Sequence, residues 1–310
     1  MAKGAKKKLQ SALISQQTRL KKNAEAKAAG QVNEQKDRVK KSTSTRRSTI
    51  PFMPTDRILL VGEGDFSFAH ALVLHPPEAL EHLPSSNVVA TAYDTEAECY
   101  EKYPGASEHV AALREKGATV LFGVDAAKLD KHPFLTKGKR FDRIVWNFPH
   151  AGKGIADQDR NIRANQELLL GFLRSAPDVL TRGPVPQVVK PRKKKRAEED
   201  EDADERMSGD ETPPGADAGG ARGTLLVTLR NVAPYTDWDL PRLAKNPPAP
   251  KANEKLVRYK QLRSFVFNRK DWRGYAHRMT KGDRAHGTGT TGQGGEDRTW
   301  EFCMRYEDEQ

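Results

Sequence analysis

The most constraining part of the sequence is the run of residues 57–68, in which a short aliphatic segment leads directly into two glycines. Its first five residues are mostly branched and aliphatic, which is typical of a strand buried on both faces of a sheet. Gly62 and Gly64 follow at once, and Asp65 precedes an apolar segment, Phe66 to Leu74. A buried strand, a glycine turn and a helix in this order predict the first unit of an α/β fold that binds a nucleotide-type ligand at the turn.

The residues of this turn indicate a cationic or zwitterionic ligand rather than a pyrophosphate. Glu63 and Asp65 flank Gly64, and two carboxylates disfavour a bound phosphate. The third glycine of the dinucleotide fingerprint would fall at position 67, which is Ser67. A tight turn without a ligand is the alternative. The candidate cofactor-binding residues of the turn are Gly62, Glu63, Gly64, Asp65, Phe66 and Ser67.

Charge divides the chain of 310 residues into parts. Residues 1–50 hold 14 Lys and Arg against three acidic residues, and we expect them to form a disordered basic arm. Residues 182–222 hold a basic cluster followed by acidic and Pro/Gly-rich sequence, which predicts a disordered insertion. The remainder of 55–310 is long enough for one α/β domain. A net charge of +11 favours a polyanionic partner, and Lys193, Lys194 and Lys195 of the basic cluster are candidate RNA-binding residues.

The two cysteines, Cys99 and Cys303, give neither a disulfide framework nor the spacing of metal ligands. We therefore predict no metal site and a reducing, intracellular compartment. No apolar run approaches the length of a membrane span, so we expect no membrane association. We also expect a monomer.

Aliphatic runs along the chain predict seven strands, most of them alternating with helices. The strands are expected at 57–61, 87–94, 118–125, 141–146, 223–229, 261–267 and 299–305, and the helices at 66–74, 96–116 with a break at 104–105, 161–180 and 235–244. The last two strands have no clear helix between them and can pair antiparallel. This pattern favours a seven-stranded, doubly wound, Rossmann-like methyltransferase sheet over a six-stranded dehydrogenase sheet.

Polar residues follow the second and third strands, at the sheet edge where ligands of open α/β sheets bind. Asp94 and Thr95 end the second strand, and an acid at this place usually accepts hydrogen bonds from ribose hydroxyls. Asp94 can equally be the N-cap of the next helix. Asp125 ends the third strand, where it can bind an adenine amino group or serve as a turn residue.

The fourth strand runs into Asn-Phe-Pro-His at 147–150. This loop resembles the Asp/Asn-Pro-Pro-aromatic loop of methyltransferases that act on amino groups of bases, in which a side-chain amide holds the target nitrogen and a ring stacks on the flipped base. The match is partial, because Phe148 replaces a proline and His150 replaces the aromatic residue. A structural turn is the alternative. We take Asn147, Pro149 and His150 as candidate catalytic residues, and Asn147 also as a cofactor contact.

Four motifs together resemble the eukaryotic 25S rRNA uridine-N3 methyltransferase family, whose Rossmann-like domain is shared with ferredoxin-fold anticodon-binding-domain proteins. They are Val-Gly-Glu-Gly-Asp-Phe-Ser-Phe at 61–68, Trp-Asn-Phe-Pro-His-Ala-Gly at 146–152, Asn-Gln-Glu-Leu-Leu at 165–169 and Tyr-Ala-His-Arg-Met-Thr at 275–280. The resemblance implies S-adenosylmethionine as cofactor, methyl transfer to N3 of a uridine in large-subunit ribosomal RNA, a pre-ribosomal partner and a location in the nucleus and nucleolus.

Uridine-N3 methylation makes specific demands on the residues. N3 of uracil carries a proton that has to leave, and His150 is the candidate base, with Asn147 positioning the ring. A histidine at 150 could alternatively stack on the base or hydrogen-bond a uracil carbonyl. His277 and Arg278 are expected at the same rim, where they would bind an RNA phosphate or the flipped base, unless they only connect the last two strands. Two other functions compete with this one. The first is a non-catalytic RNA-binding ribosome-assembly factor, and the second is a nicotinamide-dependent oxidoreductase, which the missing third glycine disfavours.

Overall fold

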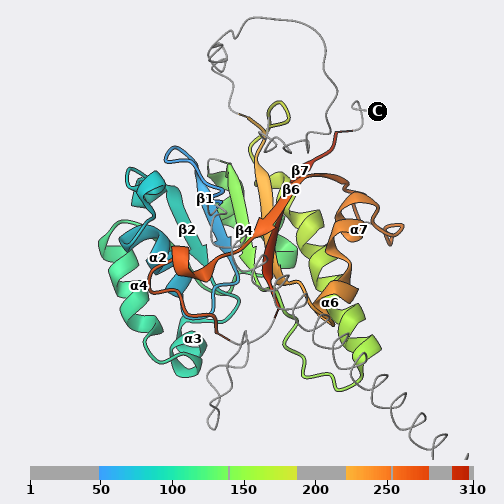
Figure 1. The fold of residues 1–310 in the computed structure, drawn as a ribbon, viewed down its shortest axis with the longest axis horizontal. Helices are drawn as coiled ribbons and strands as arrows, with labels where there is room; N and C mark the ends of the chain where they lie inside the picture. The colour runs from blue at the N-terminus through green and yellow to red at the C-terminus, as the bar shows by residue number, and fades with distance from the viewer. Residues whose placement is uncertain (1–48, 139, 187–220, 253, 279–294, 307–310) are drawn as a thin grey trace, which may run out of the picture. The chain divides into compact units, whose positions relative to one another are not determined.

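The computed structural model describes residues 49–138, 140–186, 221–252, 254–278 and 295–306 (Figure 1). Nearly all of the predicted basic arm lies outside these residues. The same is true of most of the predicted charged insertion, including Lys193, Lys194 and Lys195. The described residues therefore belong mainly to the predicted α/β domain.

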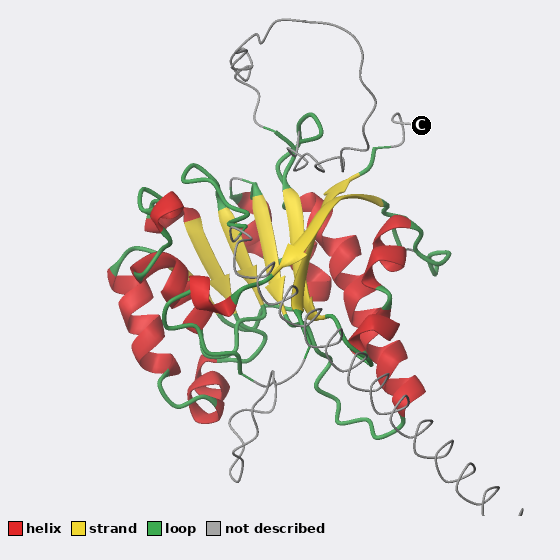
Figure 2. Cartoon of the chain, in the orientation of Figure 1, coloured by secondary structure: helices red, strands yellow, loops and turns green. Residues whose placement is uncertain are grey.

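One mixed sheet of seven strands runs through the described residues (Figure 2). Its strands are β1 (Ile58–Val61), β2 (Val88–Thr91), β3 (Thr119–Leu121), β4 (Arg143–Asn147), β5 (Thr224–Arg230), β6 (Tyr259–Val266) and β7 (Asp297–Met304). They lie in the order β3-β2-β1-β4-β5-β7-β6. Strands β1 to β5 are parallel, whereas β7 runs antiparallel to both of its neighbours. The predicted seven-stranded sheet with an antiparallel last strand is confirmed.

Helices cover both faces of this sheet. The α-helices are α2 (Ser67–Leu74), α3 (Glu96–Lys102), α4 (Ala106–Glu115), α5 (Pro133–Lys137), α6 (Gln158–Ser175) and α7 (Leu240–Lys245). Short 3-10 helices are η1 (Glu78–Leu80), η2 (Ser85–Asn87), η3 (Ala126–Lys131), η4 (Ala176–Asp178), η5 (Tyr235–Trp238) and η6 (Arg269–Asp271). In Figure 1, α2, α3 and α4 lie to one side of the strands, and α6 and α7 to the other.

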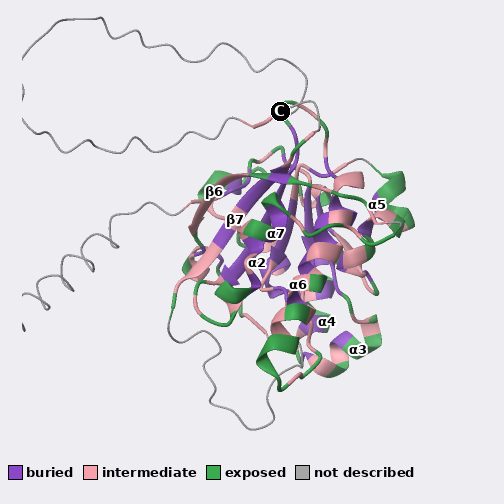
Figure 3. Ribbon diagram, turned by 90° about the vertical axis from the view of Figure 1, so that its right-hand side faces the viewer, coloured by how far each residue is buried: buried purple, intermediate pink, exposed green. Residues whose placement is uncertain are grey.

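Alternate residues of each central strand enter different cores, which explains why the strands are continuous aliphatic runs. Ile58 and Leu60 of β1 belong to a cluster with α2 and α4. Leu59 and Val61 belong to a second cluster, with Phe172 of α6 and residues of α7. Strands β1, β2 and β5 are accordingly buried along nearly their whole length, and buried strands fill the centre of the domain in Figure 3.

The helices differ from the predicted ones mainly at their ends. The helix predicted at 161–180 is α6, which begins earlier because the Asp157 carboxylate caps it, accepting from the backbone N–H of Arg160 at 2.8 Å. The predicted break at 104–105 is confirmed, since Gly105 has a φ of 90° and separates α3 from α4. Helices η3 and α5 were not predicted. Their sequence between 126 and 137 has little helical periodicity.

Strand β7 enters the sheet between β5 and β6 and aligns three polar residues. Asn147, the last residue of β4, pairs with Thr228 of β5, and Thr228 pairs with Thr299 of β7. Residues that pair directly across neighbouring strands point to the same face of the sheet. The end of β4 is therefore linked to a strand that lies about 150 residues further along the chain.

Candidate functional site

A cavity of about 790 Å³ lies at the carboxyl ends of β1, β2 and β4. The exit of β3, residues of α6 and the segment 275–278 complete its walls. Residues 275–278 form a strap along one side of the cavity. Most predicted site residues border the cavity, and they are Gly62, Glu63, Gly64, Asp65, Ser67, Asp94, Asp125, Asn147, Pro149, His150, His277 and Arg278. The structure thus brings together residues from five separate parts of the sequence.

Two predicted cofactor-binding residues are not among those that border the cavity. Phe66 has a φ of 59° and its side chain is fully buried, with its ring 5.4 Å from that of Phe122. Thr95 is the N-cap of α3 and forms a capping box with Glu98. The helix cap that was left open for Asp94 therefore belongs to Thr95.

The two glycines of the turn have different roles. Gly62 has a φ of 67°, and a Cβ placed on it would lie 2.6 Å from Nε1 of Trp146. Gly64 has no positive φ, and a Cβ there would meet Tyr103 and Cβ of Arg278 at ordinary contact distances of 3.4 and 3.5 Å. The fold therefore requires glycine at 62, whereas at 64 it accepts a methyl group.

We predict that Gly62→Ala lowers the free energy of unfolding by about 2 kcal/mol, because alanine is strained at positive φ and overlaps Trp146. Gly64→Ala is the matched variant and is expected to change it by less than about 0.5 kcal/mol. Urea denaturation of both variants measures the difference. Equal loss in the two variants would contradict this assignment of roles.

Glu63 is a half-buried carboxylate at the start of α2. Its Oε2 accepts from the backbone N–H of Ala69 at 3.2 Å, and its own N–H donates to the carbonyl of Thr91 at 2.8 Å. Burial, together with the neighbouring Asp65 carboxylate, raises the pKa of Glu63 to about 8. A cation bound beside a carboxyl group with such a raised pKa stabilises its charged form.

Asp65 is held by the strap rather than left open in the cavity. Its Oδ2 lies 2.7 Å from Nε of Arg278, and its Oδ1 accepts from the backbone N–H of Ser67 at 3.0 Å. The Ser67 hydroxyl donates to the carbonyl of Ala276 at 3.0 Å and lies 3.2 Å from the N–H of the same residue. Three contacts therefore fasten the strap over the glycine turn. Arg278, a predicted RNA-binding residue, forms one of these contacts with the turn.

The acids that end β2 and β3 border the cavity, and both have lysine partners. Oδ1 of Asp94 lies 2.6 Å from Nζ of Lys102. Asp125 caps η3 by accepting from the N–H of Ala127 at 2.9 Å, and its second oxygen lies 3.0 Å from Nζ of Lys128. Asp125 thus has the role of a turn residue while remaining in the cavity wall, and each carboxylate still has acceptor capacity for a ligand.

The backbone conformation of the loop after β4 explains why its sequence departs from the Asp/Asn-Pro-Pro pattern. Phe148 has a φ of 53°, which proline cannot adopt because its ring holds φ near −65°. Its ring lies 4.4 Å from that of His277 and 5.0 Å from the guanidinium carbon of Arg269. Proline is therefore excluded at this position, and the ring of Phe148 joins the loop to the strap.

His150 is better placed to donate a hydrogen bond to the target than to accept a proton from it. Its Nδ1 accepts from the backbone N–H of Gly152 at 2.9 Å. In the neutral imidazole one nitrogen is an acceptor and the other carries the proton, so the proton of His150 lies on Nε2. This geometry disfavours the predicted role of His150 as a base and favours a hydrogen bond to a carbonyl of the target.

His277 is neutral, which favours one of its two predicted contacts over the other. Burial is the largest cause and the Arg269 guanidinium the next, and together they lower the pKa of His277 to about 4. The ring lies against Phe148, and Nδ1 is 3.5 Å from the hydroxyl of Tyr275. A neutral, stacked ring is suited to contact a base rather than to attract a phosphate.

Other residues of the cavity wall were missed at the level of sequence. Trp146 precedes Asn147 and packs on Phe172 with ring centroids 4.8 Å apart, and Tyr103 lies beside Gly64. Tyr93, 70% exposed, stands at the rim next to Asp94. Its place directly before a predicted ligand-binding acid was a usable signal. Tyr103 gave none, because it reaches the turn only through the fold of α3 and α4.

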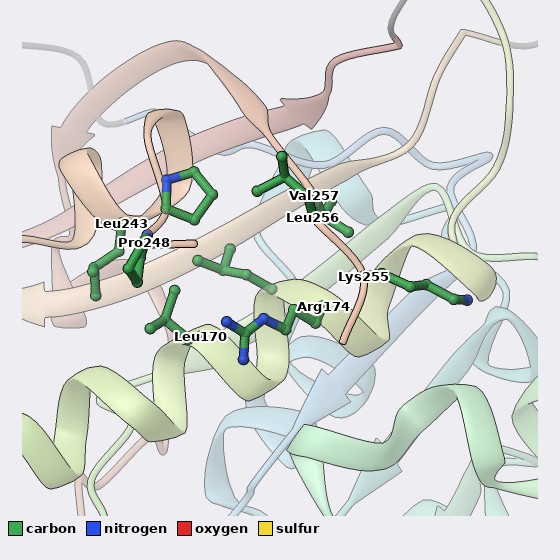
Figure 4. A pocket seen from close by; sticks show the side chains of 9 residues that line it. Leu170, Arg174, Leu243, Pro248, Lys255, Leu256 and Val257 are labelled. Atoms are coloured by element: carbon green, nitrogen blue, oxygen red, sulfur yellow. The ribbon is translucent and has the colours of Figure 1, made fainter. Parts of the chain in front are cut away.

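A second hollow, between α6, α7 and residues 255–257, encloses essentially no free volume. Its side chains, including Leu170, Arg174, Leu243 and Leu256, pack against one another (Figure 4). Within the described ranges, no group of three or more His, Cys, Asp or Glu is arranged to hold a metal ion. No helix of those ranges is long and apolar enough to cross a membrane.

Comparison with known families agrees with the motifs of the cavity. The rRNA (uridine-N3-)-methyltransferase BTM5-like family model matches residues 59–279, which is more than half of the chain. The chain belongs to this family. The glycine turn, Asp94, Asp125, the loop after β4 and the strap all lie within the matched residues. The predicted family resemblance is thus confirmed.

Relatives of this family member match only part of their own length. The 25S rRNA (uridine(2634)-N(3))-methyltransferase of Saccharomyces cerevisiae is 34% identical over 146 residues, covering 41% of this chain and 42% of the yeast protein. Heavy metal-associated isoprenylated plant protein 41 of Arabidopsis thaliana is 33% identical over 189 residues, 61% of this chain and 28% of that protein. Ferredoxin-fold anticodon-binding domain-containing protein 1 homolog of Mus musculus is 41% identical over 126 residues, with coverages of 41% and 18%. The chain spans less than half the length of each.

Proposed function

We propose that this chain transfers a methyl group from S-adenosylmethionine to N3 of a uridine in large-subunit ribosomal RNA. One observation carries the proposal. The glycine turn, two acids at strand ends and the loop 147–150 border a single cavity of about 790 Å³, at the sheet edge where open α/β folds bind ligands. The family assignment and the activity named for the yeast relative support the choice of uridine N3.

The cavity wall fits S-adenosylmethionine. When bound, this cofactor supplies an electrophilic methyl group on a sulfonium. Glu63, whose pKa of about 8 would fall beside a cation, would hold the amino-acid end. Asp94 would accept from the ribose hydroxyls, and Asp125 from the adenine amino group.

The loop after β4 fits a uracil ring. Nδ2 of Asn147 has no hydrogen-bond partner among the described residues, and Nε2 of His150 carries the ring proton. Both groups are donors, and uracil presents carbonyl oxygens on either side of N3. His277 and Phe148 add a stacked pair of rings beside them.

The proposal extends to partners and location. A net charge of +11 supports binding to ribosomal RNA or to a pre-ribosomal particle through counterion release. The basic arm 1–50 and Lys193, Lys194 and Lys195 would add affinity for RNA, and the basic cluster supports a nuclear and nucleolar address. Residues 55–310, interrupted by 182–222, would form one methyltransferase domain that acts as a monomer.

A second candidate is a non-catalytic RNA-binding assembly factor on the same scaffold. The ion pairs that already engage three acids of the cavity wall favour it, namely Asp65 with Arg278, Asp94 with Lys102 and Asp125 with Lys128. In an enzyme a ligand shares or displaces these partners. In a scaffold the pairs serve only the fold.

Calorimetric titration of the full chain with S-adenosylmethionine distinguishes the methyltransferase from the assembly factor. A separate titration with NADH tests the competing nicotinamide-dependent oxidoreductase. We expect a Kd of about 1–100 μM for S-adenosylmethionine and no heat with NADH. Asp94→Asn is expected to weaken binding about tenfold, whereas Asp178→Asn, which removes a carboxylate that does not border the cavity, leaves it unchanged. Absence of binding both with and without ribosomal RNA would favour the assembly factor.

A further inference from the structure

A row of three polar side chains crosses the sheet from the cavity wall into the interior. Thr228 Oγ1 donates to Oδ1 of Asn147 at 2.8 Å. Thr228 Oγ1 also lies 2.8 Å from Oγ1 of Thr299. The two threonines are 0% and 3% exposed, and the three residues pair in register across β4, β5 and β7. The row is therefore held by the sheet itself.

The protons of this row have one arrangement. A threonine hydroxyl has a single proton, and that of Thr228 is donated to Asn147, so Thr299 donates to Thr228. The acceptor oxygen of the Asn147 amide is thereby used inside the protein. Its Nδ2 is shielded from solvent and has no hydrogen-bond partner among the described residues. A shielded donor without a partner is unfavourable unless a ligand supplies an acceptor.

We propose that Thr228 and Thr299 are positioning residues that fix Asn147 as a hydrogen-bond donor, and so select a base whose target nitrogen lies beside carbonyl oxygens. The inference rests on the proposed function and adds the residues that decide between bases. N3 of uracil lies between O2 and O4, which are acceptors, whereas the amino groups of adenine and cytosine are donors and need an acceptor. An amide turned the other way would present its oxygen and fit those amino groups.

The Nδ2 donor of Asn147 affects the reactivity of the target base as well as its selection. Uracil becomes nucleophilic at N3 when its N3 proton leaves to solvent water or hydroxide, and the negative charge then spreads onto O2 and O4. A hydrogen bond from Nδ2 of Asn147 to one of these oxygens is stronger to the anion than to the neutral base. The row therefore lowers the pKa of the bound uracil, and this is an effect that a merely structural contact does not have.

The test compares Thr228→Val, Thr228→Ser and Thr224→Val in the full chain. Valine has nearly the shape of threonine but no hydroxyl, and serine keeps the hydroxyl. Thr224 is the matched control, since it lies on the same strand, is equally buried and donates to Glu301 at 2.9 Å, at the far end of β5. For each variant, the rate of N3-methyluridine formation in ribosomal RNA is measured against pH, and the Kd for S-adenosylmethionine is measured by calorimetry.

We expect Thr228→Val to lower kcat about 10–100-fold at pH 7 and to move the rising limb of the pH–rate profile up by about one unit. Cofactor Kd is expected to stay within about threefold of the parent value. Thr228→Ser should have the parental kcat and the parental pH–rate profile. Thr224→Val should leave the rising part of the pH–rate profile at the parental pH. Thr299→Val, which acts through Thr228, shifts the limb in the same direction by a smaller amount and serves if Thr228→Val does not fold.

If Thr228→Val and Thr299→Val both bind the cofactor and both keep the parental rising limb of the pH–rate profile, the inference is overturned and the proposed function stays intact. A shift of equal size in Thr224→Val would overturn the inference as well. A parent protein that binds S-adenosylmethionine but forms no N3-methyluridine would remove the proposed function, and the assigned selectivity with it. The two failures are thus distinguished by the parent alone.

Discussion

Replacing Asn147 by aspartate is expected to lower kcat/KM for uridine methylation by about 10³-fold or more. Aspartate has the size of asparagine and still accepts from Thr228, but it presents a carboxylate oxygen where Nδ2 was. Removing one donor from a developing oxyanion lowers kcat by about 10²–10³-fold, and an anion in its place adds repulsion. Cofactor affinity is expected to be no weaker, because the added negative charge lies in a wall that takes a cation.

Methyl transfer and calorimetric cofactor binding, measured on the same preparation, test this expectation. Asn246→Asp is the control for the change in charge, since Asn246 is exposed at the end of α7 and does not border the cavity. It should keep parental rates. If Asn147→Asp retained more than about a tenth of the parental kcat/KM, Asn147 would not contact the target base.

Replacing Glu63 by glutamine is expected to weaken binding of S-adenosylmethionine about 100-fold at pH 8.5. Glutamine keeps the shape of the side chain and removes the charge that pairs with the cationic cofactor. Because the pKa of Glu63 is about 8, the parent protein is mostly protonated there at pH 6.5. Parental affinity should therefore rise between pH 6.5 and 8.5, and the difference between parent and variant should grow with it.

The same substitution should stabilise the protein without ligand, with a defined dependence on pH. The folded pKa of about 8 lies above the ordinary value of 4.5, so between these values the folded state holds a proton that the unfolded state has lost. This contribution to stability is fully present below pH 4.5 and is lost as pH rises to about 8. The Tm of Glu63→Gln should thus exceed that of the parent by about 5 °C at pH 8 and by little at pH 5.

Thermal unfolding at several pH values measures this difference, with Glu115→Gln at the exposed end of α4 as control. A Tm difference that does not change with pH would show that Glu63 is charged throughout. Loss of cofactor affinity together with a gain in stability is the pattern expected of a residue kept for binding.

The sequence predicted the frame of the site because that frame depends on local signals. Residues 57–68 specify strand, turn and helix within twelve positions, and the acids at 94 and 125 follow strands that are recognisable by composition. Parallel strands then bring their carboxyl ends to one edge of the sheet. The cavity at that edge follows from these three facts together.

The contacts that decide the chemistry could not be predicted, because they join distant parts of the chain. Arg278 pairs with Asp65, which precedes it by 213 positions, and no periodicity indicates the pairing. Thr299 reaches Thr228 only because β7 enters between β5 and β6, in a register that depends on long-range packing.

Local backbone geometry accounts for the other differences between the predicted and the observed site. Phe66 was expected in the cofactor site, but its positive φ turns the side chain into the core. His150 was expected to act as a base, but the N–H of Gly152 takes the acceptor nitrogen. Residue types and spacing specify neither of these features, since both depend on backbone angles in a turn.

The most direct test of the central claim is product identification. The purified full chain is incubated with ribosomal RNA and S-adenosylmethionine carrying a ¹³C methyl group, and the nucleosides are separated by liquid chromatography and identified by mass spectrometry. We predict labelled N3-methyluridine from the parent and none from Asn147→Asp. Label in N6-methyladenosine or N4-methylcytidine would contradict the donor character of the site. If the protein binds the RNA but leaves it unlabelled, the proposed methyltransferase activity would be contradicted.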